Sequence, residues 1–108
     1  MSDLKQQTYY FVLASQKFLC EQEPLGESLR EREKNYQERH KEKDFWLVIN
    51  PAFLSAPSMA EYRQKCPHPA AAVISTDPYF INWLKLRLEF VLTGEFVAPS
   101  AEIPDPLA

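Results

Sequence analysis

Residues 8–15 (TYYFVLAS) restrict the fold more than any other stretch, because they are apolar on both faces of an extended chain. Successive side chains of a β-strand point to opposite faces. Odd-numbered positions from 9 to 13 and even-numbered positions from 10 to 14 are all aromatic or aliphatic here. A strand of this kind is stable where the sheet is covered on both sides. The sequence therefore predicts a sheet that lies between two layers of other elements.

Two further apolar runs and three helical patterns follow this strand. The order strand, helix, strand, helix, strand, helix predicts an α/β (α+β) sandwich. In this fold a small sheet of about three to four strands, with antiparallel pairing, is packed with about three to four helices. The predicted strands are 8–15, 44–50 and 70–76, and the predicted helices are 25–43, 58–66 and 77–93.

The length of 108 residues is enough for one domain and too short for two. Because 45% of the residues are hydrophobic, the chain can bury a core, and we expect residues 1–96 to form a single domain. After Gly94 the sequence carries three prolines. Residues 97–108 are therefore predicted to be a Pro-rich C-terminal tail that is extended or disordered.

The predicted helix 25–43 mixes Glu with Lys and Arg and has only a thin apolar stripe. This composition indicates a solvated helix that rests on the sheet along a narrow seam. The stripe consists of Leu25, Leu29 and Tyr36, with Arg32 and His40 completing the line.

Residues 77–93 permit two interpretations. Positions 84–90 alternate between apolar and charged residues, as in a half-buried strand. The flanks favour a helix, because residues 77–78 (DP) are a typical helix start and residues 93–94 (TG) a common helix stop. A helical wheel also gathers every polar residue except Arg87 into one narrow stripe. We therefore predict a helix.

Arg87 is the exception on this helix, because Trp83 and Phe80 are among its nearest neighbours on the wheel. An unpaired buried charge would cost several kcal/mol, so its guanidinium group needs acceptors. Either the stem packs on apolar neighbours while the head reaches solvent or an internal partner, or Arg87 belongs to an interface. Since the helix is apolar over most of its circumference, either the fold wraps it or a partner covers it.

Asp44, Phe45 and Trp46 place two large aromatic rings directly after an acid at the start of the second strand. The two rings point to opposite faces of the sheet, so at most one of them can lie under the charged helix. Both rings could belong to the core. Alternatively, one of them could be an aromatic anchor at an interface.

Several functional classes are not supported by the composition. A formal net charge of −3 gives no electrostatic footprint for nucleic acid. The two glycines, Gly26 and Gly94, are too few for a P-loop or a dinucleotide fingerprint. No apolar run approaches the roughly 20 residues of a membrane span, and the N-terminus has no signal-peptide pattern. We expect neither nucleic-acid binding nor direct membrane insertion.

Catalytic and metal-binding signals are weak. Cys66 and His68 in CPHP could together contribute to a metal site, but neither a CxxC pair nor a second His at helical spacing accompanies them. The chain has no Glu-x-x-His motif of di-iron carboxylate proteins and no Gly-x-Ser-x-Gly elbow. We expect no cofactor, no metal and no catalytic residue.

Four segments of the chain stand out together: YYFVLASQKFL, KDFWLV…PAFL…AP, CPHPAAAVISTD and FINWLKLRLEFVLTGEFVAPS. They are similar to one known family, the small accessory subunit of the aerobic magnesium-protoporphyrin IX monomethyl ester oxidative cyclase. That complex makes the fifth ring of chlorophyll in cyanobacteria and plastids. The resemblance runs from about Thr8 to Ser100, and the segments share their order and approximate spacing with the family.

The resemblance implies a compact α/β sandwich that is not itself the catalyst. A separate di-iron catalytic subunit carries out the oxidation, and the small protein binds and stabilises it. The implied location is the cytoplasm of a cyanobacterium or the plastid stroma, peripheral to the thylakoid membrane. The family's docking patch maps onto Ala14, Asp44, Phe45 and Arg87, to which the aromatic patterns described above add Trp46 and Trp83.

Two alternatives remain open at this point. The chain could be a carrier that presents a tetrapyrrole, with Tyr9, Phe45, Trp46 and Trp83 as a stacking wall. It could also be an enzyme of another kind, for which Cys66 and His68 would be the candidate residues.

Overall fold

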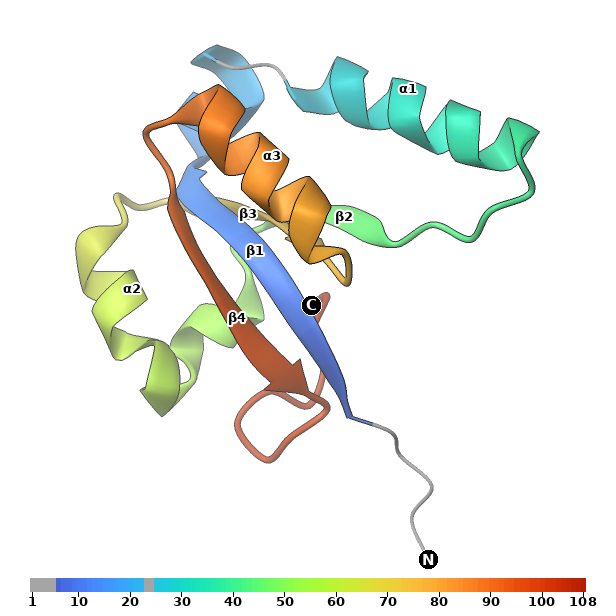
Figure 1. Ribbon diagram of the computed structural model, residues 1–108. Coiled ribbons are helices and arrows are strands. Elements are labelled where there is room, and N and C mark those ends of the chain that lie inside the picture. Colours follow the sequence, from blue (N-terminus) through green and yellow to red (C-terminus); the bar gives the residue numbers. More distant parts are fainter. Residues whose placement is uncertain (1–5, 23–24) are drawn as a thin grey trace, which may run out of the picture.

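The computed structural model describes residues 6–22 and 25–108 and shows a four-stranded antiparallel sheet with helices on both faces (Figure 1). The strand order is β2-β3-β1-β4. The predicted α/β (α+β) sandwich with antiparallel pairing is confirmed. The strands are β1 (Gln7–Ser15), β2 (Phe45–Ile49), β3 (Ala70–Ser75) and β4 (Leu92–Ala98). The helices are α1 (Leu25–Glu38), α2 (Ala60–Lys65) and α3 (Pro78–Leu88), with short helical turns at Phe18–Gln22, Ala52–Ser55 and Pro57–Met59.

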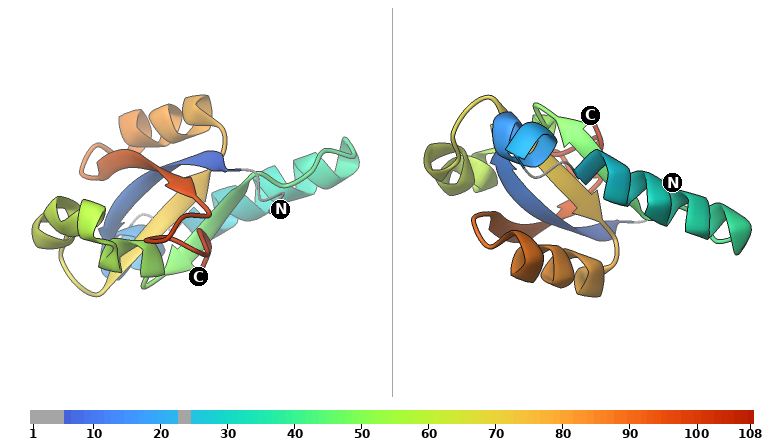
Figure 2. Two further views of the ribbon diagram at one scale, coloured as in Figure 1. Left: turned by 90° about the horizontal axis from the view of Figure 1, so that it is seen from below. Right: turned by 90° about the horizontal axis from the view of Figure 1, so that it is seen from above.

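β1 lies in the middle of the sheet, and both of its apolar faces are buried. α1 and α3 cover one face, whereas α2, the neighbouring 3-10 turns and the C-terminal residues cover the other (Figure 2). Phe11 and Leu13 belong to the core on the α2 side, and Val12 and Ala14 belong to the core on the α1–α3 side. Residues 8–15 predicted a sheet that is covered on both faces, and this prediction is confirmed.

α3 begins as predicted and ends earlier than predicted. The Asp77 carboxylate accepts a hydrogen bond of 2.9 Å from the backbone N–H of Tyr79, as an N-cap does. The helix stops at Leu88 instead of residue 93, so the predicted C-terminal end was wrong. The chain turns at Glu89, which has a φ of 62°, and then enters β4. Residues 92 and 93, which we predicted to be helical, instead belong to β4 and pair with β1.

The C-terminal residues are part of the packed domain. The boundary that we predicted at residue 96 falls inside β4, which continues to Ala98 and pairs with β1 from Gln7 to Leu13. Beyond β4, Ile103 is 3% exposed within the core on the α2 side. The backbone oxygen of Ala108 accepts a hydrogen bond of 2.9 Å from the N–H of Ala52. Residues 97–108, which we predicted to be extended or disordered, contribute apolar side chains and a backbone acceptor to this face.

α1 is shorter than the predicted helix 25–43. It ends at Glu38, and His40 has a φ of 53° in the turn that follows. Leu25 and Tyr36 are its buried residues, which confirms the narrow apolar seam. Leu29 and Arg32 are partly buried beside them, and most of the remaining residues are polar and exposed. α1 extends beyond the edge of the sheet (Figure 1).

Candidate protein-docking site

One side of α3 carries large hydrophobic side chains that nothing in the described chain covers. Tyr79 is 85% exposed, Trp83 51%, Leu86 69% and Phe90, just beyond the helix, 80%. These residues are spaced by four, three and four positions, so they follow one side of the helix, which we call the α3 outer face. The sheet covers only the opposite side of the helix, which consists of Phe80, Ile81, Leu84 and Leu88.

Arg87 lies on the α3 outer face. Its guanidinium carbon is 5.6 Å from the centre of the Trp83 ring, one helical turn away. The side chain is exposed, and within the described residues it forms no ion pair. Of the alternatives for Arg87, the structure therefore shows a stem on an apolar neighbour and a head that reaches solvent.

Asp44 and Phe45 lie at the start of β2, and contacts with α1 and α3 hold them within the fold. The Asp44 carboxylate accepts a hydrogen bond of 3.0 Å from the Tyr36 hydroxyl of α1. Phe45 is 1% exposed and makes edge contacts with the Tyr36 ring at 5.4 Å and with the Phe80 ring at 5.6 Å. Phe45 is thus a core residue that supports the surface from below, and a partner could not contact it directly without rearrangement.

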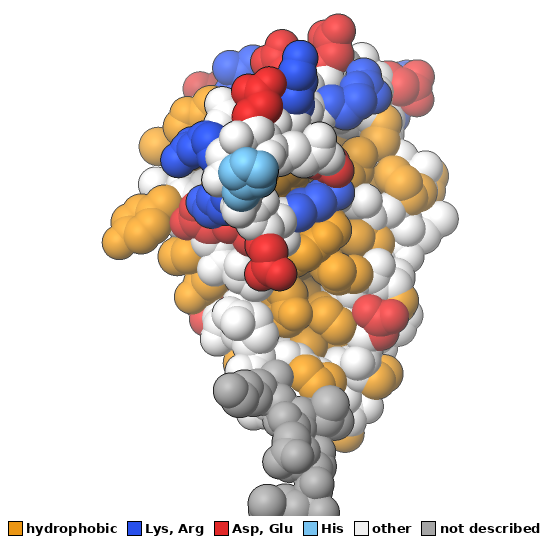
Figure 3. Space-filling view, turned by 90° about the vertical axis from the view of Figure 1, so that its right-hand side faces the viewer, with side chains coloured by type: hydrophobic (Ala, Val, Ile, Leu, Met, Phe, Trp, Pro, Cys, Tyr) orange, Lys and Arg blue, Asp and Glu red, His pale blue; other side chains and the backbone are white. Residues whose placement is uncertain are grey.

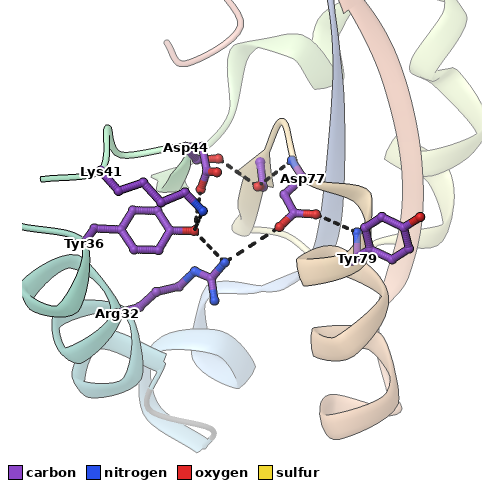
Figure 4. Close-up of polar contacts among 7 residues, drawn as sticks. Arg32, Tyr36, Lys41, Asp44, Asp77 and Tyr79 are labelled. Carbon is purple, nitrogen blue, oxygen red and sulfur yellow. Dashed lines mark hydrogen bonds and ion pairs between the residues drawn. The ribbon is translucent and has the colours of Figure 1, made fainter. Parts of the chain in front are cut away.

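The arginine linked to Asp44 is Arg32 of α1, through the Tyr36 hydroxyl. Figure 4 shows the network: Arg32 Nη2 donates to the Tyr36 hydroxyl at 2.7 Å, and Lys41 Nζ donates to the same oxygen at 3.3 Å. Tyr36 in turn donates to Asp44, and the Arg32 guanidinium is 3.9 Å from the Asp77 carboxylate of α3. The network therefore connects α1, the start of β2 and the start of α3.

Aromatic rings surround Arg32 as well. Its guanidinium carbon is 3.9 Å from the centre of the Phe80 ring, 5.0 Å from that of Tyr36 and 5.4 Å from that of Phe45. Contacts of this kind are attractive because the faces of aromatic rings are electron-rich. Sequence reasoning did not assign this role to Arg32. The available signal was its place on the thin apolar stripe, four positions before Tyr36.

A cleft of about 390 Å³ separates α1 from the α3 outer face. It brings Arg87 and Trp83 together with Arg32 and Tyr36, the neighbours of Asp44 and Phe45. We call it the α1–α3 cleft, and it is lined by Ser28, Glu31, Arg32, Asn35, Tyr36, Arg39, Trp83 and Arg87.

Ala14 and Trp46 do not line the α1–α3 cleft. Ala14 is buried in β1 and lines a second cavity, of about 220 Å³, near the end of α3 beside Phe90. Trp46 points to the opposite face of the sheet and packs against the core on the α2 side. The sequence patterns and the resemblance predicted one group of six residues, but the structure distributes them over three places.

The predicted aromatic stacking wall is not assembled. Tyr9 stacks on Phe96 at a ring distance of 5.6 Å on the α2 side, where Trp46 also packs. Phe45 is buried on the other face. This prediction was wrong because alternate residues of a strand point to opposite faces. The structure thus removes the sequence argument for a tetrapyrrole carrier.

Cys66 and His68 are both engaged with the backbone. Burial raises the pKa of the Cys66 thiol, which reduces its thiolate fraction at neutral pH. A ring nitrogen of His68 is 3.1 Å from the carbonyl oxygen of Arg63. Within residues 6–22 and 25–108, no three His, Cys, Asp or Glu side chains are grouped so that they could hold a metal ion.

No helix in this part of the chain has the length and apolar character needed to cross a membrane.

Comparison with known proteins links the whole domain to one family. The family model described as "Ycf54 protein" matches residues 7–98. A "Ycf54-like protein" from Synechocystis sp. is 61% identical over 101 residues, which cover 94% of this chain and 76% of that protein. "Protein YCF54, chloroplastic" from Arabidopsis thaliana is 40% identical over 95 residues, which cover 87% of this chain and 44% of the plant protein.

Solved structures agree with this result. The X-ray structure of the All0216 protein from Nostoc sp. has a TM-score of 0.95 and 62% identity, and the match covers 97% of each chain. The Ycf54 protein from Synechocystis sp. has a TM-score of 0.93 and 59% identity, with 96% of this chain and 97% of that chain covered. The fold described above is thus shared with these cyanobacterial proteins.

Proposed function

This chain belongs to the Ycf54 family, and we propose that it is a non-catalytic accessory subunit of the aerobic magnesium-protoporphyrin IX monomethyl ester oxidative cyclase. In this role it binds and stabilises the di-iron catalytic subunit that carries out the oxidation in chlorophyll biosynthesis. The sequence resemblance supplies the identity of the partner. The α3 outer face, an exposed apolar stripe with an arginine that forms no ion pair to any residue the structure describes, is the observation that carries the proposal of a docking function.

Docking on the α3 outer face has a clear driving force. Full burial of one large apolar side chain contributes about 1.5–3 kcal/mol, and four such side chains lie on this face. Aromatic residues and arginine dominate the energy of protein interfaces. Arg87 supplies orientation, because its planar guanidinium group forms paired hydrogen bonds with a carboxylate.

The proposed location follows from the partner. The relatives come from a cyanobacterium and a plant chloroplast. We place the protein in the cyanobacterial cytoplasm or the plastid stroma, where it would reach the thylakoid surface through the catalytic subunit.

Co-purification of the di-iron catalytic subunit with the tagged protein tests the proposal. We expect wild type to capture this subunit and Arg87→Ala to weaken capture by about 2–5 kcal/mol, since a charged contact broken on one side costs this much. Arg87→Lys should also bind more weakly, because an ammonium group cannot replace the guanidinium fork. Lys85→Ala is the matched control, because Lys85 is exposed on the same helix but outside the α3 outer face.

Circular dichroism and thermal melting of each variant check the fold. Failure of wild type to capture the subunit would contradict the proposed function. Equal capture by Arg87→Ala and wild type would show that Arg87 is not an anchor.

A further inference from the structure

The α1–α3 cleft carries positive charge that the described chain does not neutralise. Arg39 and Arg87 line it from opposite walls, and within the described residues neither forms an ion pair. Within residues 6–22 and 25–108, the Arg39 guanidinium group donates a hydrogen bond of 3.4 Å to the neutral Asn35 amide oxygen. Glu31 is the one acidic residue of the lining. The cleft thus has an excess of guanidinium groups on an otherwise acidic protein.

The floor of the cleft is fixed before any partner arrives. Arg32 is held by the Tyr36 hydroxyl, by the nearby Asp77 carboxylate and by the Phe80 ring. Because these contacts join α1 to α3, they also set the distance between the two walls. A site that is ordered in advance loses less conformational entropy on binding than a flexible one.

Hydrophobic surface borders the charged part of the cleft. In the view of Figure 3, charged side chains gather at the top, where α1 lies, and hydrophobic side chains form a surface below them. On the α3 side, Trp83 and Arg87 line the cleft one turn apart, and Leu86 and Phe90 continue the exposed apolar stripe. A ligand that fits both the guanidinium groups and the exposed apolar stripe must carry carboxylates beside an apolar stripe of similar spacing.

We propose that the α1–α3 cleft receives an amphipathic helix of the partner subunit, with Asp or Glu residues at the edge of its apolar stripe. The inference rests on the proposed function and adds the chemistry of the partner segment and a second contributing wall, α1. The apolar stripe packs on Trp83 and Leu86, as in other complexes in which a helix occupies a groove. The carboxylates pair with Arg39 and Arg87, for which a planar carboxylate is the preferred partner.

Charge reversal at the C-terminal end of α1 tests the inference. Arg39→Glu, in the turn directly after the helix, makes one wall of the cleft acidic, whereas Arg30→Glu makes the same change within α1 at an exposed residue that lines a different cavity, on the β2 side. With the purified di-iron catalytic subunit as the probe, we expect Arg39→Glu to raise Kd by about tenfold or more, since close charge pairs at interfaces couple this strongly. Arg30→Glu should change Kd by less than about threefold, because solvent screens isolated surface charges.

Two further measurements identify the occupant. A photo-crosslinking amino acid at Asn35, which lines the cleft, should attach to an acidic helical peptide of the catalytic subunit, identified by mass spectrometry. Sedimentation with phosphatidylglycerol vesicles tests the competing occupant, an anionic membrane surface. We expect no vesicle binding that depends on Arg39.

The outcomes separate this inference from the proposed function. If wild type does not bind the catalytic subunit, both are overturned. If wild type binds and the two charge reversals act equally, or if the crosslinked peptide lacks acidic residues, only the cleft assignment is overturned. Binding to vesicles that Arg39→Glu abolishes, with binding to the subunit unchanged, would assign the cleft to a membrane.

Discussion

Gly94 illustrates how single residues fix the packing of this sheet. A Cβ atom at this position would lie 2.7 Å from Cζ of Tyr62 and 2.8 Å from Cζ of Phe11. Real Cβ atoms do not approach other atoms this closely, so the two rings occupy the space of a side chain. Tyr62 also donates a hydrogen bond of 3.2 Å to the carbonyl oxygen of Thr93, which holds its ring over the glycine. Close approach of α2 to β4 therefore requires glycine at this place.

Gly94→Ala should lower the free energy of unfolding by about 1–3 kcal/mol, the usual cost of overpacking a core. Gly26→Ala is the matched control, because the nearest atom to a Cβ there is Arg30 Nη1 at 3.7 Å and the position is helical. Alanine is the better helix former, so this variant should be as stable as wild type or more stable. Urea unfolding of the two variants measures the difference. A stable Gly94→Ala protein would show that α2 can move away from β4.

At the scale of elements, the end of α3 determines which residues the outer face presents. The N–H of Phe90 donates to the carbonyl oxygen of Leu88 at 2.7 Å, so Glu89 is the central residue of a γ-turn. Its φ of 62° and ψ of −52° are unfavourable for any residue with a side chain. This turn stops the helix, leaves Phe90 exposed beside the second cavity, and directs the chain into β4.

Glu89→Gly should raise the free energy of unfolding by about 1 kcal/mol, because relief of the unfavourable φ exceeds the entropy cost of a glycine. Lys85→Gly, at an exposed position inside the same helix, should instead lower it by about 0.7 kcal/mol. Thermal melting of both variants provides the comparison. Loss of stability in Glu89→Gly would mean that the helix does not end in this turn.

At the scale of the whole molecule, the two faces of the sheet serve different purposes. The α2 side is closed by its own chain, with Ile103 inserted near the C-terminus and Glu102 accepting hydrogen bonds from the N–H and hydroxyl of Ser58 at 3.1 and 2.9 Å. The α1–α3 side is closed only at its inner surface and leaves the α3 outer face uncovered. Stability and docking should therefore respond to different substitutions.

Ile103→Ala and Leu86→Ala test this separation. Ile103→Ala should lower the free energy of unfolding by about 2–4 kcal/mol, the cost of a cavity in a core, without weakening capture of the catalytic subunit by the folded protein. Leu86→Ala should change stability by less than about 0.5 kcal/mol, because Leu86 is exposed, and should weaken capture. Chemical denaturation and co-purification on the same two samples decide the matter. The reverse pattern would contradict the assignment of the two faces.

The sequence by itself determined those features that depend on local periodicity. Residues 8–15 predicted a sheet covered on both sides, and Asp77 marked the start of α3. The apolar circumference of that helix predicted more hydrophobic surface than the sheet covers, but left open whether the fold itself would wrap it. The alternation of Phe45 and Trp46 predicted that their rings lie on opposite faces. Each of these follows from the repeat of a helix or a strand and from the hydrophobic effect, which act within a few residues.

Only the tertiary structure decided the features that depend on distant partners. Residues 92–98 become a strand because β1, about eighty positions earlier in the chain, offers an unpaired edge. Asp44 is linked to Arg32 of α1 because Tyr36, one helical turn after Arg32, lies between them and hydrogen-bonds to both. Ile103 is buried because the chain turns after β4, where Ser100 and Ile103 hydrogen-bond to each other, and returns onto the α2 side. Hydrogen-bond partners and contacts of this kind are set by the packing of whole elements, and no local pattern encodes them.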